Sequence, residues 1–165
     1  MNFLPEEIEQ YAEQFTSSEP KLLADLNRFT HGNVLQSRMI SGHLQGRVIS
    51  MLSKMIRPKT VVEVGTYTGY SALCWAEGLV DGGVVHTIEI DDELEPKIRK
   101  FINQSEFTNR IELHIADAMK KLNELEGPFD IVFLDIDLPM VSGMDVLRQT
   151  SRKTLTTKYV LMTAY

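Results

Sequence analysis

Residues 61–79, VVEVGTYTGYSALCWAEGL, decide the fold. A short β-branched run is followed directly by a glycine-containing turn and then by an apolar stretch with helical spacing. Gly65 permits a sharp backbone turn, and Gly69 permits close packing of the helix that follows. This order predicts a strand whose carboxyl end leads straight into a helix, which is the repeating unit of parallel α/β sheets.

Further strand patterns, separated by helical stretches, follow at 84–90, 111–115, 129–135 and 159–163. Gly82-Gly83 and Gly127-Pro128 fall where helices must give way to strands. Strands that alternate with helices imply crossover connections and a parallel sheet covered on both faces. We therefore predict a Rossmann-like α/β three-layer sandwich, with a five-stranded parallel sheet of order 3-2-1-4-5 and N-terminal cover helices.

The N-terminal 58 residues are predicted to form these cover helices. Pro5 suits a first helical turn, and a second helix is expected after Ser18. A third, 41–55, has apolar residues at three- and four-residue spacing, which predicts a core-facing side: Leu44, Val48, Met51, Leu52 and Met55. We expect one domain over residues 1–165, with N-terminal helices (1–58), a ligand-binding core (59–134) and a last helix and strand (135–165).

Composition excludes several classes of protein. Seventeen basic and 23 acidic residues give a net charge of −6, which opposes nucleic-acid binding. No apolar run approaches the ~20 residues that cross a membrane, and Met1 to Phe15 has no apolar signal region. The single cysteine, Cys74, lies in an apolar helical pattern and is expected to fill core space. These features predict a cytoplasmic protein without a nucleic-acid or membrane partner.

The glycine turn and the second strand predict an adenosine-type ligand. In a doubly wound sheet the ligand lies beyond the carboxyl ends of the strands. Tyr67 stands where the dinucleotide fingerprint has its second glycine, so a pyrophosphate is less favoured than another adenosine ligand. Glu89 ends the second strand about twenty residues later, where a carboxylate can accept from both ribose hydroxyls. Asp117, after the third strand, either faces the adenine amino group or caps the next helix.

Segments 61–79, 86–94, 115–122 and 129–135 together resemble, in order and spacing, the cation-dependent O-methyltransferases of the catechol and caffeoyl-coenzyme A type. The resemblance covers about residues 39–135. It implies S-adenosylmethionine as the cofactor, contacted by Met39, Glu63, Gly65, Tyr67, Ser71, Glu89, Asp117, Ala118 and Asp135. It also implies that Asp135 is the first Mg²⁺-binding and catalytic aspartate.

The last segment departs from that family pattern. Leu138 stands where the family has its lysine general base, and the final strand lacks the Asp-Asn pair that completes the metal site. Mg²⁺ requires near-octahedral oxygen ligation, so Asp135 alone leaves the site incomplete, although Asp137 is a candidate second carboxylate. We expect cofactor binding to be retained and catalysis to be impaired.

Residues 129–149 and 158–165 also resemble part of a response-regulator receiver domain. In that resemblance Asp135 matches the phosphoacceptor and Thr163 the switch threonine. We interpret the chain as an engineered or recombined methyltransferase–receiver chimera, in preference to a divergent natural protein. The alternatives are an engineered scaffold without activity and an Asp135 phosphoacceptor module.

The final strand is predicted to be an exposed edge. Residues 159–165, YVLMTAY, carry no charged side chain. An uncovered edge of this kind invites pairing with another chain. We therefore expect a homodimer, formed either through this strand or through the N-terminal helices.

Overall fold

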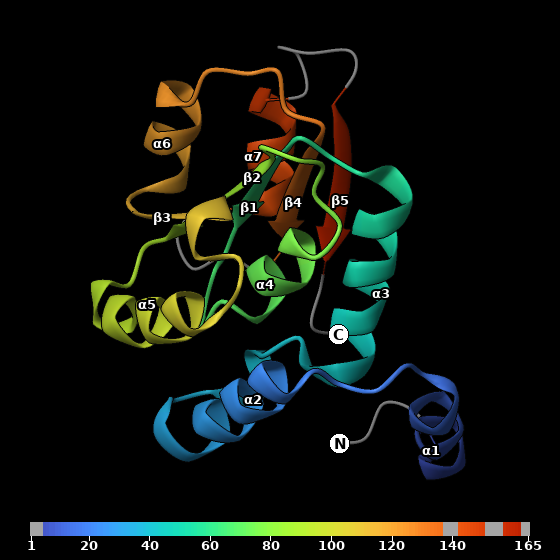
Figure 1. The fold of residues 1–165 in the computed structure, drawn as a ribbon. Helices are drawn as coiled ribbons and strands as arrows, with labels where there is room; N and C mark the ends of the chain where they lie inside the picture. Colours follow the sequence, from blue (N-terminus) through green and yellow to red (C-terminus); the bar gives the residue numbers. More distant parts are fainter. Residues whose placement is uncertain (1–4, 137–141, 151–156, 163–165) are drawn as a thin grey trace.

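The computed structural model describes residues 5–136, 142–150 and 157–162. Within them, five parallel strands form one sheet of order β3-β2-β1-β4-β5 (Figure 1). The strands are β1 (Thr60–Val64), β2 (Val84–Glu89), β3 (Ile111–Ile115), β4 (Ile131–Asp135) and β5 (Lys158–Met162). The predicted Rossmann-like fold and its strand order are confirmed.

Helices cover both faces of this sheet (Figure 1). They are α1 (Glu6–Phe15), α2 (Lys21–Asn33), α3 (Gly42–Ile56), α4 (Tyr70–Ala76), α5 (Glu95–Gln104), α6 (Ala118–Glu124) and α7 (Gly143–Thr150), with short 3-10 turns η1 (Ser37–Met39), η2 (Asp92–Leu94) and η3 (Thr108–Arg110). One buried cluster joins α2, α3, α4 and α5 to the sheet, and a second joins α6 and α7 to its opposite face.

The β1 sequence explains why the sheet is buried on both sides. Successive side chains of a strand point to opposite faces. Val61 belongs to the cluster under α4 and α5, whereas Val62 belongs to the cluster under α6 and α7, and neither is exposed. A continuous apolar run therefore fits this position, because both faces of β1 need apolar side chains.

Most of the apolar stripe of α3 does not face the core, so that prediction is wrong except for Leu52, which is partly buried and packs against the core cluster. Leu44, Val48, Met51 and Met55 are 41%, 43%, 52% and 74% exposed. The buried side of α3 instead contains Gly46, Ile49, Ser50 and Ser53. Small residues allow α3 to approach α4 closely: a Cβ on Gly46 would collide with the ring of Tyr70, and the Ser53 hydroxyl donates to the Trp75 carbonyl oxygen at 2.6 Å.

Two smaller expectations are also tested by the structure. Cys74 is fully buried, as predicted for a core residue, and burial raises the pKa of its thiol to about 12. Within the described residues, β5 pairs only with β4, so it is an edge strand there. No helix in the described ranges is long and apolar enough to cross a membrane.

Candidate functional site

A cavity of about 450 Å³ lies at the carboxyl ends of the strands. The residues after β1, β2 and β3, the end of β4, and the connection between α2 and α3 form its walls. The residues singled out from the sequence that line it are Met39, Gly65, Tyr67, Ser71, Glu89, Asp117, Ala118 and Asp135. Eight of the nine positions are thus brought to one cavity, and Glu63 is the exception.

The turn after β1 is held in an unusual backbone conformation. Gly65 has φ +99° and Gly69 has φ +91°, values that glycine adopts without a steric cost. Tyr67 between them has φ +53°, which is uncommon for a residue with a side chain. Its hydroxyl donates to the Leu35 carbonyl oxygen at 2.9 Å, so this side chain ties the turn to the opposite wall of the cavity.

Glu89 fixes the same turn from the end of β2. Its Oε2 accepts from the Tyr67 backbone N–H at 2.7 Å, and its Oε1 accepts from the N–H groups of Ile90 and Asp91 at 2.9 and 3.0 Å. Hydrogen bonds to an ionised carboxylate are short and strong. The carboxylate is therefore locked at the cavity wall, and about one acceptor site remains for a hydroxyl donor, because two carboxylate oxygens offer about four sites and three are taken.

Glu63 lies beneath the turn rather than in the cavity wall. The Thr66 and Thr87 hydroxyls are 2.6 Å apart, and Thr87 donates to Glu63 Oε2 at 2.6 Å. Because the single Thr87 proton goes to Glu63, the Thr66 hydroxyl must donate to Thr87. Burial raises the pKa of Glu63 to about 7, although the Ser71 and Thr87 hydroxyls favour its ionised form.

Asp117 caps the next helix, which is one of its two predicted roles. Its Oδ1 accepts from the Lys120 backbone N–H at 2.9 Å at the start of α6. Asp117 and Ala118 also line the cavity, so capping does not remove the carboxylate from it. The contact with adenine stays a prediction.

Asp135 is half-buried at the carboxyl end of β4. Gly143 approaches its backbone so closely that a Cβ at this position would collide with the Asp135 carbonyl oxygen. Asp137, Leu138 and Thr163 lie outside the described residues. The predicted second carboxylate, the lysine replacement and the switch threonine therefore have no structural counterpart to compare.

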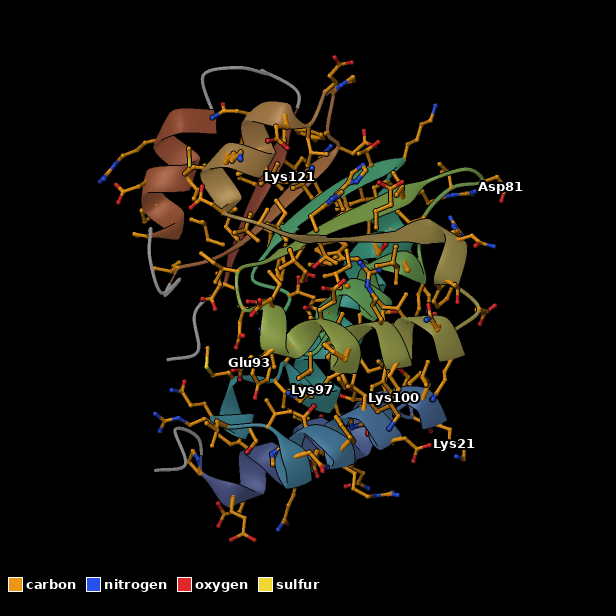
Figure 2. All side chains as sticks on the ribbon, turned by 90° about the vertical axis from the view of Figure 1, so that its left-hand side faces the viewer. Lys21, Asp81, Glu93, Lys97, Lys100 and Lys121 are labelled. Atoms are coloured by element: carbon orange, nitrogen blue, oxygen red, sulfur yellow. The ribbon has the colours of Figure 1, made fainter. Side chains whose placement is uncertain are left out.

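Sequence reasoning missed most of the wall contributed by the α2–α3 connection and by η2. Val34, Leu35, Gln36 and Ile40 line the cavity beside Met39. Glu93 and Lys97 line it from η2 and α5, at the end of α5 near the α2–α3 connection (Figure 2). Lys97 Nζ donates to the Glu93 carbonyl oxygen at 3.0 Å. Glu93 lies in the 86–94 motif segment but had no predicted role, and the other residues belong to no recognised motif. The three-dimensional fold brings all of them to the site.

A parallel sheet of this order, with a glycine turn and a strand-end carboxylate around one cavity, defines a Rossmann-like, ligand-binding α/β protein. Residues 13–140 match the family described as O-methyltransferase. Because this match covers more than half of the chain, the protein belongs to the O-methyltransferase family.

Curated relatives agree with this assignment. The chain is 32% identical over 130 residues to the O-methyltransferase ankF of Aspergillus thermomutatus, covering 78% of this chain and 54% of the relative. It is 30% identical over 125 residues to the caffeoyl-CoA O-methyltransferase of Stellaria longipes, covering 72% and 52% respectively. The chain thus spans about half the length of these relatives.

Solved structures share the fold. The SAH-bound methyltransferase PaMTH1 of Podospora anserina has a TM-score of 0.82 at 24% identity, covering 98% of this chain and 72% of PaMTH1. An O-methyltransferase from Bacillus cereus in complex with SAH has a TM-score of 0.71 at 26% identity, covering 78% and 60%. The likeness to PaMTH1 includes nearly the whole chain. A methyltransferase fold therefore accounts for the last helix and strand, and these comparisons give no support to a receiver segment or a chimera.

Proposed function

We propose that this chain is the S-adenosylmethionine-binding domain of an O-methyltransferase. The observation that carries the proposal is the Glu89 carboxylate, fixed by three backbone N–H groups at the wall of a 450 Å³ cavity beside the Gly65 turn. Membership of the O-methyltransferase family and the SAH-bound structural neighbours support the choice of ligand. We assign this role to a single domain over residues 1–165, divided as the sequence predicts.

We propose an orientation for the cofactor from the chemistry of the cavity wall. Glu89 accepts from the ribose at the acceptor site that its three backbone N–H partners leave free, and its carboxylate is already positioned at the cavity wall. Gly65 allows close approach of the ligand, and Tyr67 holds the turn against the α2–α3 connection. Ser71 and Met39 take the methionine end, and Asp117 with Ala118 takes the adenine end. Glu63 acts as a positioning residue through Thr87 and Thr66.

Efficient methyl transfer is not part of the proposal. Mg²⁺ prefers an octahedral oxygen cage, and among the described residues the β4 end supplies one carboxylate, Asp135, to such a site. The family's metal would activate an acceptor hydroxyl, and Leu138 in place of the base lysine removes general-base help worth about 10² to 10⁴ in rate. We therefore assign cofactor binding to this chain and expect impaired catalysis.

An Asp135 phosphoacceptor module is the second candidate. Its phosphoacceptor would be the Asp135 carboxylate, which is half-buried at the carboxyl end of β4. Acetyl phosphate with Mg²⁺ would add one phosphoryl group to the chain, and Asp135→Asn would lose it. An inactive scaffold would fail both this assay and cofactor binding.

Calorimetric titration with S-adenosylmethionine tests the proposal. We expect micromolar binding by the wild type and loss of binding in Glu89→Ala, because the ribose acceptor is removed. Glu106→Ala is the matched control, since Glu106 is exposed and lies outside the cavity. Glu89→Ala must keep the wild-type circular dichroism spectrum for its loss to count. Equal affinity of Glu89→Ala and the wild type would refute the assignment.

A further inference from the structure

Two histidines and a glutamate form a cluster on neighbouring strands, away from the cavity. His86 lies on β2, and Glu112 and His114 lie on β3. In the parallel register His86 is opposite Glu112, and His114 is two residues further along β3. Side chains two residues apart on a strand share a face, so all three project from the same face of the sheet. None of them lines the cavity.

Two of the three distances within this cluster match those between ligands of a tetrahedral metal ion. His86 Nδ1 is 3.2 Å from His114 Nε2 and 3.2 Å from a Glu112 carboxylate oxygen, and one ligand atom from each residue lies within 4.8 Å of the others. Zinc–nitrogen and zinc–oxygen bonds of about 2.0–2.1 Å place tetrahedral ligands roughly 3.3 Å apart. The two shorter separations already have about that value, and the third, between Glu112 and His114, is at most 4.8 Å, so the proposed site requires a movement of the exposed Glu112 side chain.

Hydrogen bonding alone satisfies the cluster poorly. A neutral His86 has at most one N–H at Nδ1, yet a Glu112 carboxylate oxygen and His114 Nε2, which donates or accepts according to its tautomer, lie at the same distance from that atom. The proton must be shared between them or must leave one contact without a hydrogen. A metal ion placed among the three atoms accepts a lone pair from each, and imidazole and carboxylate are common zinc ligands.

The surroundings leave one side of the cluster open. The His86 side chain is 15% exposed, whereas that of Glu112 is 59% exposed, so a metal ion can enter and keep a water ligand. Lys121 on α6 acts on both histidines as a positive charge and opposes a second one there. Its Nζ lies 3.2 Å from a Glu124 carboxylate oxygen, and the charges of Glu112 and Glu124 offset it.

We propose that His86, Glu112 and His114 bind one divalent transition-metal ion, with Zn²⁺ the best match to the donor set and spacing. Two imidazoles, one carboxylate and a water complete a four-coordinate site of the kind that zinc adopts. The ion joins β2 to the β3 edge of the sheet, immediately before the residues at 89–91 and 116–118 that form the cavity wall. This site is separate from Asp135, because β1 lies between β2 and β4.

Titration with Zn²⁺ alone tests the site without any cofactor or activity. The full chain is stripped with a chelator and titrated calorimetrically in a large excess of Mg²⁺, which occupies carboxylate-only sites but competes poorly for imidazole. We expect one equivalent of zinc to bind and the Tm to rise. His86→Ala and His114→Gln should each weaken binding by at least about tenfold, since even an indirect contact to a metal is worth that much.

The controls separate this site from the others. His31→Ala should bind zinc as the wild type does, because His31 is an exposed histidine on α2. Glu112→Gln keeps the shape of the side chain and should weaken zinc binding while leaving Tm without metal unchanged. Zinc binding that is lost in Asp135→Asn but kept in His114→Gln would overturn the proposal. Absence of zinc binding by the folded wild type would overturn it as well.

Discussion

The buried Glu63 carboxyl makes the stability of this protein depend on pH in a specific way. Its pKa is about 7 in the folded chain against an ordinary value of 4.5, and the side chain is fully buried. The folded state therefore holds this proton more tightly than the unfolded state does. The stability contributed by the protonated group is fully present below pH 4.5 and is lost as the pH rises to about 7. The loss amounts to about 3 kcal/mol.

Glu63→Gln removes this dependence while keeping the size and an acceptor for Thr87. Among the residues that the structure describes, none hydrogen-bonds to Glu63 Oε1, so the new amide N–H₂ costs about 1–3 kcal/mol at every pH. Relative to wild type, the unfolding free energy of the variant should rise by about 3 kcal/mol between pH 4.5 and pH 8. Urea denaturation across this range measures the difference, in which all other titrating groups cancel.

Glu77 provides a control of opposite sign. Hydrogen bonds from Arg47, Lys54 and Ser50 lower the pKa of Glu77 to about 2 despite its partial burial. The stability that ionised Glu77 contributes is present above pH 4.5 and falls as the pH drops towards 2. The unfolding free energy of Glu77→Gln should therefore fall furthest below that of the wild type above pH 4.5. Stability curves of wild type and Glu63→Gln that run parallel from pH 4.5 to pH 8 would refute the account of Glu63.

Three further outcomes follow from the packing. Gly46→Ala should destabilise the fold by about 1–3 kcal/mol, because its methyl group meets the Tyr70 ring. Gly32→Ala, with open space around it, should stabilise the fold by about 0.4–1 kcal/mol. Chemical denaturation checks both, and an unchanged stability of Gly46→Ala would contradict the tight α3–α4 contact. Cys74 should react with a thiol reagent only on unfolding, because it is buried and its pKa is about 12; rapid labelling of the native protein would show otherwise. Val48→Glu, on the exposed stripe of α3, should convert the expected homodimer to a monomer in light scattering without loss of Tm, and an unchanged mass would exclude this face from the interface.

Much of the sheet is predictable from the sequence because its strands are buried on both faces. A strand such as β1 reads as a continuous apolar run, and its bounds of Thr60–Val64 differ by one residue from the predicted start. The Gly65 turn and Glu89 were also recognisable, since a positive φ and a strand-end carboxylate have specific residue requirements. Parallel order then brings them together.

The orientation of α3 was not predictable in the same way. Periodicity identifies an apolar stripe but not which side of the helix its neighbours occupy. Here the contact with α4 depends on Gly46 and Ser53, which carry little apolar surface and gave no signal. For Glu63 the motif position was recognisable but the expected role was not. The motif suggested ligand contact, whereas a buried chain of hydrogen bonds from Glu63 through Thr87 to Thr66 indicates that Glu63 supports the turn.

The most direct test of the cofactor site is an amide NMR titration of the isotope-labelled chain with S-adenosylmethionine. The account predicts that the N–H signals of Gly65, Tyr67, Ile90 and Asp91 shift together, because these groups form the turn and hold the Glu89 carboxylate. The amide of Lys100, on α5 outside the cavity, should stay in place. Shifts confined to residues away from the cavity, or no shifts at millimolar cofactor in a folded chain, would contradict it.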